Sequence, residues 1–400
     1  MVVELTRSFY LAFGFNRISI SKARKNGVNE TVKRQYLAGC LVVLLLSMTK
    51  TSMVFAQENS NYPNRQVEVK LNTKQSDKSW LQLSQKTDFE HESTDLIANI
   101  LYRRLSSWHK SMMPNGANGI NVRWLHNQAR HWYIEEQRSG EDLIIGGLIK
   151  NDPQAITAGF KMFDWGFAHQ VDDGSFFMTG DRFHSTSFFV QAVARTLLVI
   201  QQSPDSEKYA HQVAKYKPLL HRAARWMISP NVWKKGIRHN KPYTHRRYLV
   251  AAALGLTGKV TADEELMKYA RKSIEDGLSL QRLDGVNPEK GGHDSSYQMV
   301  GVVYASRWVT YFPNDSITPK VVAMIDKSLV WQQTRMLPSG EISTEGNTRT
   351  GGQEKGRSDK VKGIDRKSAL RSFAYWASVT GNRMWEENAR QIAKFYYKIP

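Results

Sequence analysis

The sequence predicts an all-α fold for the main part of the chain. From Ser93 onward, apolar residues recur at helical spacing with almost no strand-like alternation. The chain has 400 residues, of which 41% are hydrophobic and 11% aromatic, enough to bury a large core. The charged fraction of 23% is ordinary for a globular protein, so the composition excludes a disordered chain.

The first 56 residues have the pattern of a secretory signal peptide. Lys33 and Arg34 precede an apolar run over residues 36–46, which is too short to span a bilayer comfortably. Residues 54–56 then offer a cleavage site. We therefore expect cleavage after Ala56 and a secreted or periplasmic protein without stable membrane insertion; an uncleaved anchor is the alternative.

Cysteine usage and charge limit the chemistry of the mature chain. Cys40 is the only cysteine and lies in the leader, so disulfides and thiol chemistry are excluded after cleavage. The formal net charge is +19, and loss of the eight basic and two acidic residues of the leader leaves +13. Such a charge favours a polyanion, which could be acidic polysaccharide, cell-wall polymer, lipid headgroups or extracellular nucleic acid, although general solubility explains the charge equally well. Among these we expect an anionic polysaccharide and no nucleic acid.

The predicted domain organisation has two parts after the leader. Residues 57–90 are polar with little periodic pattern, which indicates a linker or loosely attached arm. Residues 91–400 form the folded domain. Its apolar positions predict helices that include residues 96–101, 156–167 and 188–197, followed by helices around residues 247–253 and 370–379.

The predicted helices come in pairs separated by similar glycine-bearing loops. Residues 170–174 and 281–285 both begin with Gln and end with Asp-Gly, and each is followed by a His-containing helix start. A third, weaker copy covers residues 333–341, and residues 229–236 lie between the first two. The glycines at 174, 236, 285 and 340 are 62, 49 and 55 residues apart. This period predicts about five to six stacked helical hairpins.

With these loops the chain resembles the (α/α) toroid shared by six-hairpin glycosidases and by chondroitin and alginate lyases. The resemblance covers residues from about 93 to 400 and depends on the hairpin period, the Asp-Gly loops and the secretion signal. The sequence contains neither the Asn-Asn-His run of such alginate lyases nor the Ser-Glu-Gly signature of one glycosidase family. The resemblance therefore implies an architecture and a carbohydrate-active enzyme, and other helical solenoids remain an alternative.

The toroid implies that loops joining outer to inner helices meet at one end and present the catalytic groups there. The catalytic candidates from these loops are His293, Tyr297, Asp294, Asp173 and Glu345. His293 and Tyr297 would serve as a base and acid pair, and the carboxylates as acids or bases. The structural alternative is that Asp-Gly forms turns and that Asp294 caps a helix.

Other polar and aromatic residues are candidates for substrate binding. A glycine-rich segment, residues 342–356, supplies Asn347 and Arg349, which would neutralise a sugar carboxylate. Residues 238–248 interleave basic and aromatic side chains, and Trp233 lies in a predicted loop among lysines. The remaining candidates are His184, Trp233, Tyr243 and His245. No metal-binding, phosphate-binding or dinucleotide motif occurs, so we expect no metal and no cofactor.

Three functions remain open from the sequence. The first is a polysaccharide lyase that cleaves a uronate-containing polymer by β-elimination. The second is a glycoside hydrolase with two carboxylates from Asp172, Asp173, Asp294 and Glu345. The third is a non-catalytic binder of an acidic glycan or nucleic acid.

Overall fold

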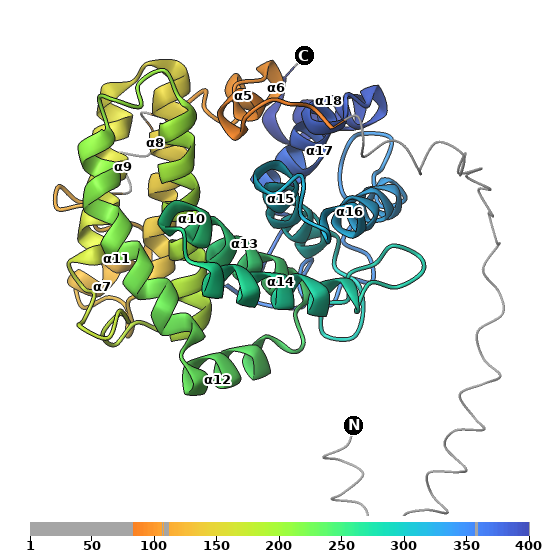
Figure 1. Cartoon of the computed structure of the whole chain (residues 1–400). Coiled ribbons are helices and arrows are strands. Elements are labelled where there is room, and N and C mark those ends of the chain that lie inside the picture. The colour runs from red at the N-terminus through yellow and green to blue at the C-terminus, as the bar shows by residue number, and fades with distance from the viewer. Residues whose placement is uncertain (1–82, 106, 108–111, 357–358, 400) are drawn as a thin grey trace, which may run out of the picture. The chain divides into compact units, whose positions relative to one another are not determined.

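A computed structural model describes residues 83–105, 107, 112–356 and 359–399 (Figure 1). The predicted signal peptide with its cleavage site, and most of the predicted polar arm, lie outside these residues. Contacts divide the chain into Met1–Leu71 and Asn72–Pro400, and every described residue belongs to the second unit. Helix α5 (Asp88–Glu92) begins shortly before the predicted domain boundary at residue 91.

The described part of the chain is all-α, as predicted, with isolated β-bridges in its loops and no strand. Most of its length forms five helical hairpins. The shorter helices are α5, α6 (Asp95–Ala98), α7 (Ile120–Leu125), the 3-10 helix η3 (Ile134–Ser139) and α12 (Pro230–Asn240). The hairpins pair α8 (Gly140–Lys150) with α9 (Pro153–Phe167), α10 (Arg182–Gln202) with α11 (Ala210–Ile228), α13 (Thr244–Thr261) with α14 (Glu264–Leu278), α15 (Ser295–Tyr311) with α16 (Thr318–Gln333), and α17 (Arg366–Thr380) with α18 (Arg383–Tyr397).

Three of these hairpins turn through the same two-residue link. A left-handed residue ends the first helix, and an Asp or Asn caps the second: Asn151 with Asp152, Ala262 with Asp263, and Gly381 with Asn382. The cap side chains accept hydrogen bonds from backbone N–H groups of the next turn. These short links force the two helices of a pair to run antiparallel and in contact.

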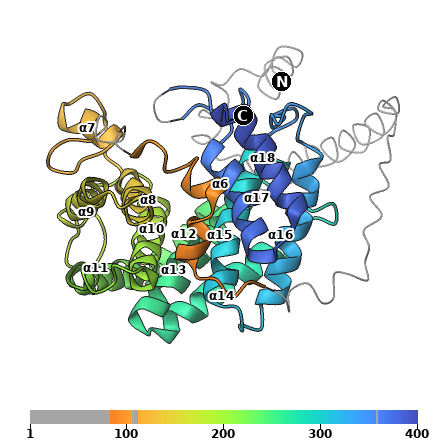
Figure 2. The same ribbon diagram turned by 90° about the horizontal axis from the view of Figure 1, so that it is seen from above.

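The first helix of each hairpin is central, and the second covers it. Helices α10, α13, α15 and α17 are buried along most of their length, whereas α14 and α18 bury one face. The central helices α8, α10, α13, α15 and α17 pack against one another in chain order. Figures 1 and 2 show α8 to α11 on one side of α13 and α15 to α18 on the other. Helix α10 has the length and hydropathy of a membrane span, but 94% of the apolar window lies buried inside the protein, as in a core helix.

The predicted loop repeat is present with four members, of which three were predicted from the sequence. In each copy the residue three positions before the glycine forms two backbone hydrogen bonds. Its carbonyl accepts from the N–H of the glycine, and its own N–H donates to the carbonyl of the residue after the glycine, as between Val171 and Ser175 and between Arg282 and Val286. The repeated glycine has positive φ and touches a backbone carbonyl of an outer helix, where a Cβ would clash. These glycines are Gly116, Gly174, Gly285 and Gly340. Gly236 lies inside α12 instead, so its prediction as a repeat loop is wrong, and Gly116 was missed.

A buried ion-pair network ties α5 to the central helices. Arg195 is fully buried and pairs with Asp88 (2.7 Å), Glu92 (2.7 Å) and Glu141 (2.9 Å). Burial alone would raise the pKa of Asp88, but the Arg195 guanidinium holds it well below its usual range. Arg371 of α17 also pairs with Glu92 (2.9 Å). Helix α5 is therefore joined to α8, α10 and α17 through a network of buried or nearly buried charges.

Candidate active site

The described residues enclose one large cavity of about 910 Å³ at the N-terminal ends of the central helices. Helix N-termini carry partial positive charge, so five of them around one space favour an anionic ligand. Basic side chains also outnumber acidic ones in the cavity lining. The central helices contribute their first turns: Glu141 and Asp142 from α8, Asp181 and His184 at the start of α10, His245 and Arg246 from α13, Ser296 and Tyr297 from α15, and Lys367 and Ser368 from α17.

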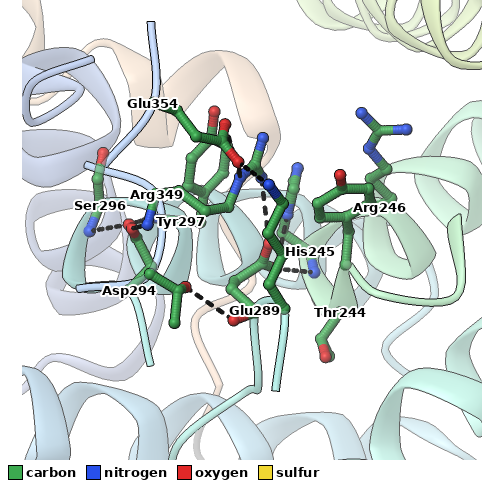
Figure 3. A network of polar contacts seen from close by, with 12 residues as sticks. Thr244, His245, Arg246, Glu289, Asp294, Ser296, Tyr297, Arg349 and Glu354 are labelled. Carbon is green, nitrogen blue, oxygen red and sulfur yellow. Dashed lines mark hydrogen bonds and ion pairs between the residues drawn. The ribbon is translucent and has the colours of Figure 1, made fainter. Parts of the chain in front are cut away.

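His245 is held by Glu289, a residue of the glycine-rich loop before α15. This loop crosses the start of α13, where the hydroxyl of Thr244 donates to the carbonyl of Pro288 (2.6 Å). Glu289 Oε1 then accepts from both the backbone N–H of His245 (3.1 Å) and its Nδ1 (2.7 Å) (Figure 3). Both side chains are almost fully buried. Glu289 therefore caps α13 and fixes the orientation of the imidazole at once.

The environment of His245 favours a neutral imidazole that can accept a proton. Burial lowers the pKa of His245, and nearby Arg349 and Arg246 act in the same direction, against the opposing effect of Glu289. With Nδ1–H donated to Glu289, the nitrogen that remains for a ligand is Nε2. Because His245 lines the cavity, this is the arrangement of an oriented general base.

Tyr297 lies beside His245 in the first turn of α15. The centroids of the two rings are 4.6 Å apart. Burial raises the pKa of Tyr297 above its ordinary value, so the phenol keeps its proton at neutral pH. The cavity wall thus places a proton acceptor and a proton donor next to each other.

Asp294 joins the glycine-rich segment 342–356 to α15. One oxygen of Asp294 caps the helix by accepting from the N–H groups of Ser296 (3.1 Å) and Tyr297 (3.0 Å). The other accepts from the N–H groups of Arg349 (3.0 Å) and Thr350 (2.8 Å) (Figure 3). With both oxygens occupied and 1% exposure, Asp294 has the structural role that its position as a cap predicts.

Arg349 reaches the cavity wall because Asp294 holds its backbone. Its guanidinium carbon lies 3.6 Å from the centre of the Tyr297 ring, and Nη1 donates to Glu289 Oε2 (3.1 Å). Its Nε lies 3.3 Å from both carboxylate oxygens of Glu354. Arg349 therefore braces Tyr297 and Glu289 in fixed positions.

Glu354 cannot act as a proton donor at neutral pH. Burial alone would raise its pKa, but hydrogen bonds from Lys290 and Lys362 and the charge of Arg349 lower it to about 2. It stays ionised and forms ion pairs with Lys290, Arg349 and Lys362 (Figure 3).

Of the five predicted catalytic residues, only Tyr297 is among the described residues that line the cavity; Asp294, the helix cap described above, and three others are not. Among the described lining residues His293, Asp173 and Glu345 do not occur. His293 Nε2 lies 3.2 Å from the carbonyl of Glu345, and its ring packs edge-on against Trp331. Asp173 accepts from the N–H of Ser175 (2.8 Å) and shapes the repeated turn. These residues lie in loops, as predicted, and the side chains of His293 and Asp173 contact other parts of those loops and α16.

Some of the predicted binding residues line the cavity, and the others do not. His184, His245 and Arg349 line the cavity. Asn347 is buried, and its amide bonds to Ser295 and Thr350, which is a structural role. The two aromatic candidates do not line the cavity. Trp233 belongs to α12 and not to a loop, and it packs against Tyr269 and Phe183. The Tyr243 ring packs against the guanidinium groups of Arg349 and Arg246.

Sequence reasoning missed Glu289 as the partner of His245. The residue stood inside the loop that attracted attention, between Pro288 and Lys290, but nothing in the sequence pairs it with a histidine 44 residues away. It also missed Arg138, Tyr304 and Arg307 of the cavity lining. For Tyr304 and Arg307 a usable signal was their spacing from Tyr297 on one face of α15.

Within the described part of the chain, no group of three or more His, Cys, Asp or Glu side chains is placed to hold a metal ion. Comparison with known proteins found no family model, no curated protein and no solved structure that matches the chain.

Proposed function

We propose that the protein is a secreted or periplasmic polysaccharide lyase that cleaves a uronate-containing polymer by β-elimination. The observation that carries the proposal is the group Glu289, His245 and Tyr297, in which an oriented imidazole lies beside a protonated phenol at a cationic cavity. The expected partner is therefore an anionic polysaccharide, with no cofactor in the proposed chemistry.

We also propose that the five hairpins form an (α/α) toroid. In support, the central helices pack in chain order from α8 to α17, and α5 contacts both of these end helices. Five hairpins agree with the lower end of the predicted range. This arrangement accounts for a single cavity that receives the start of every central helix.

The proposed reaction needs one base and one acid. His245 Nε2 removes the C5 proton of a uronate unit, and the electron pair left on C5 forms the double bond to C4. The C4–O4 bond breaks, and the Tyr297 hydroxyl donates its proton to the departing O4. The products are a chain with an unsaturated end and a chain with a free hydroxyl. The lowered pKa of His245 and the raised pKa of Tyr297 give each residue the protonation state that this step requires.

Arg246 is the best placed residue to neutralise the uronate carboxylate, which makes the C5 proton more acidic. It lines the cavity, and its nearest carboxylate is Asp181 at 3.8 Å. Its buried Nε has no hydrogen-bond partner. Arg349, the residue expected from the sequence, already serves Glu289 and Glu354. Arg246 thus supplies the charge stabilisation that an enolate-like transition state needs.

The hydrolase alternative is less well supported. None of its four predicted carboxylates, Asp172, Asp173, Asp294 and Glu345, is among the described residues that line the cavity. An acid catalyst also requires a raised carboxyl pKa. For the cavity residue Asp142, burial acts in that direction, but Lys367 and Arg371 bring the pKa well below its ordinary value.

The experiment is to incubate the protein with a panel of acidic and neutral polysaccharides and follow ultraviolet absorbance from the unsaturated uronate product. We expect absorbance to rise with at least one uronate polymer and with no neutral one. Tyr297→Phe removes only the hydroxyl and should abolish the rise, whereas His293→Ala, outside the cavity, should retain it.

Two results would contradict the proposal. Reducing ends that appear without absorbance would indicate hydrolysis. Salt-sensitive binding of a uronate polymer with no cleavage, equal in wild type and Tyr297→Phe, would indicate a binding protein.

A further inference from the structure

A second group of cationic and phenolic side chains lines the cavity away from His245 and Tyr297. The residues of α15 that line the cavity include Tyr297, Val300, Tyr304 and Arg307. Their spacing of three, four and three residues places them on one face of the helix. At about 1.5 Å per residue, Arg307 lies about 15 Å along the helix axis from Tyr297.

Arg307 is a buried cation with unfilled hydrogen-bonding capacity. Its side chain is 4% exposed, and Nη2 pairs with Glu141 Oε1 at 3.1 Å. That carboxylate is shared, because Arg195 Nη1 contacts the same oxygen at 2.9 Å. The Nε and Nη1 atoms of Arg307 are buried without a hydrogen-bond partner. Buried donors normally have partners, so these two indicate a place where an acceptor binds.

Tyr304 lies beside Arg307, Arg138 lies near Tyr304, and both residues also line the cavity. The Arg307 guanidinium lies 5.1 Å from the centre of the Tyr304 ring. Arg138 covers Phe188 at 4.2 Å, and the Phe188 ring lies 6.2 Å from that of Tyr304. Burial raises the pKa of Tyr304 to about 12, although both arginines act to lower it, so its hydroxyl remains a donor.

The acidic neighbours do not cancel this cationic character. Glu141 is divided between Arg307 and Arg195, as described above. Glu135 lies 3.7 Å from Arg138, a longer ion pair at a side chain that is 43% exposed, and Glu136 and Asp365 act on Arg138 more weakly. Asp88, which also interacts with Arg307, is already paired with Arg195. The group therefore offers guanidinium and phenol donors to one small volume of the cavity.

We propose that Arg307, Tyr304 and Arg138 form a second anion subsite, which binds the carboxylate of another uronate unit of the same polysaccharide chain. This inference rests on the proposed function, because it takes an acidic polysaccharide as the ligand of the cavity. The separation of about 15 Å along α15 means that a disaccharide at Tyr297 does not reach Arg307. Longer chains with an acidic group on successive units engage both subsites.

The test measures binding, so that it does not depend on cleavage. Uronate di-, tri-, tetra- and pentasaccharides are titrated calorimetrically into the full chain carrying Tyr297→Phe, alone or with Arg307→Gln, Tyr304→Phe or Arg138→Gln. We expect the longer oligosaccharides to bind Tyr297→Phe more tightly than the disaccharide does. Arg307→Gln should weaken their binding by at least about tenfold, since hydrogen bonds to charged groups contribute that much, and should leave disaccharide binding unchanged.

Thermal unfolding of each variant separates loss of binding from loss of folding. If Arg307→Gln does not fold, Tyr304→Phe and Arg138→Gln decide the question, because they remove a hydroxyl and a partly exposed charge. The subsite would be overturned if oligosaccharides of all lengths bound with equal affinity, if the substitutions weakened binding of all lengths equally, or if no oligosaccharide bound. Length-dependent binding without any unsaturated product from wild type would overturn the lyase and leave the subsite standing.

Discussion

Two histidines near the start of α15 have different structural roles. His293 belongs to the polar loop before α15, and its ring nitrogen lies against the carbonyl of Glu345. His245 begins α13, with one nitrogen on the carboxylate of Glu289 and its ring beside Tyr297 in the cavity wall. The comparison shows that titratable residues clustered in the sequence need not line the cavity, whereas a single histidine from another hairpin has both an oriented partner and access to it.

The same contrast applies to carboxylates. Asp294 is saturated by backbone N–H groups, whereas Glu289 divides its oxygens between a histidine and an arginine of the cavity wall. Asp294 therefore stabilises the loop, whereas Glu289 orients side chains of the proposed site.

The largest expected effect separates the two histidines directly. His245→Gln keeps a polar side chain of similar length but removes the base, and we expect kcat to fall by about 10²–10⁴. His293→Gln should change kcat by less than about threefold, because its partner is a loop carbonyl. Initial rates on the uronate polymer that wild type cleaves measure both. Equal losses in the two variants would contradict the assignment.

A second large effect concerns stability. Arg195→Met removes the partner of Asp88 and Glu92 in a site without water, and we expect a loss of about 3–5 kcal/mol of unfolding free energy. Denaturant unfolding measures it. The lowered pKa of Asp88 contributes stability that is present above its unfolded value of about 3.8 and is lost as the pH falls through the folded value. A loss below about 1 kcal/mol would show that the network does not hold α5 in place.

A third effect distinguishes cavity cations from surface cations. Arg246→Gln removes the charge proposed to neutralise the uronate carboxylate, and we expect kcat/KM to fall by about 10²–10³. Arg238→Gln is the matched control, because Arg238 is an exposed residue of α12 outside the cavity lining. Similar small losses in both variants would mean that bulk charge, and not Arg246 itself, attracts the substrate.

The smallest effect is the pH dependence. The base must be neutral, so activity should fall as the pH drops through the pKa of His245, which burial places below the ordinary 6.5. The acid must be protonated, so activity should also fall at high pH, above the ordinary tyrosine value of 10.0. A plot of kcat/KM against pH measures both limbs. If the loss of activity at low pH had its midpoint above neutral pH, a different group would act as the base.

Much of the fold could be predicted from the sequence because the signals are local. Helical spacing of apolar residues and the Gln-to-Gly loops with Asp-Gly identified helices and turns. The prediction of a repeat loop at Gly236 was wrong, because the short helix α12 is rich in Lys and Arg and so resembles a loop in composition. Gly116 was missed since it lacks the Asp-Gly signature of the copies at Gly174 and Gly285.

The site could be predicted only in part, because its chemistry depends on contacts between distant segments. Tyr297, His245 and His184 were recognised as polar residues at helix starts and Arg349 as a basic residue of the glycine-rich segment, and all four line the cavity. The pairing of Glu289 with His245 joins residues from two hairpins, so neither spacing nor composition encodes it. Arg307 lies inside a largely apolar helix, where its charge is a usable sign of a buried partner.

The most direct test of β-elimination at His245 and Tyr297 is the mass of the product chain ends, formed in ¹⁸O-labelled water. The account predicts unsaturated ends that are one water lighter than hydrolysis products and carry no label, and no such product from Tyr297→Phe. Saturated non-reducing ends in place of unsaturated ones, with ¹⁸O entering at the new reducing ends, would contradict it and assign the cavity to a hydrolase.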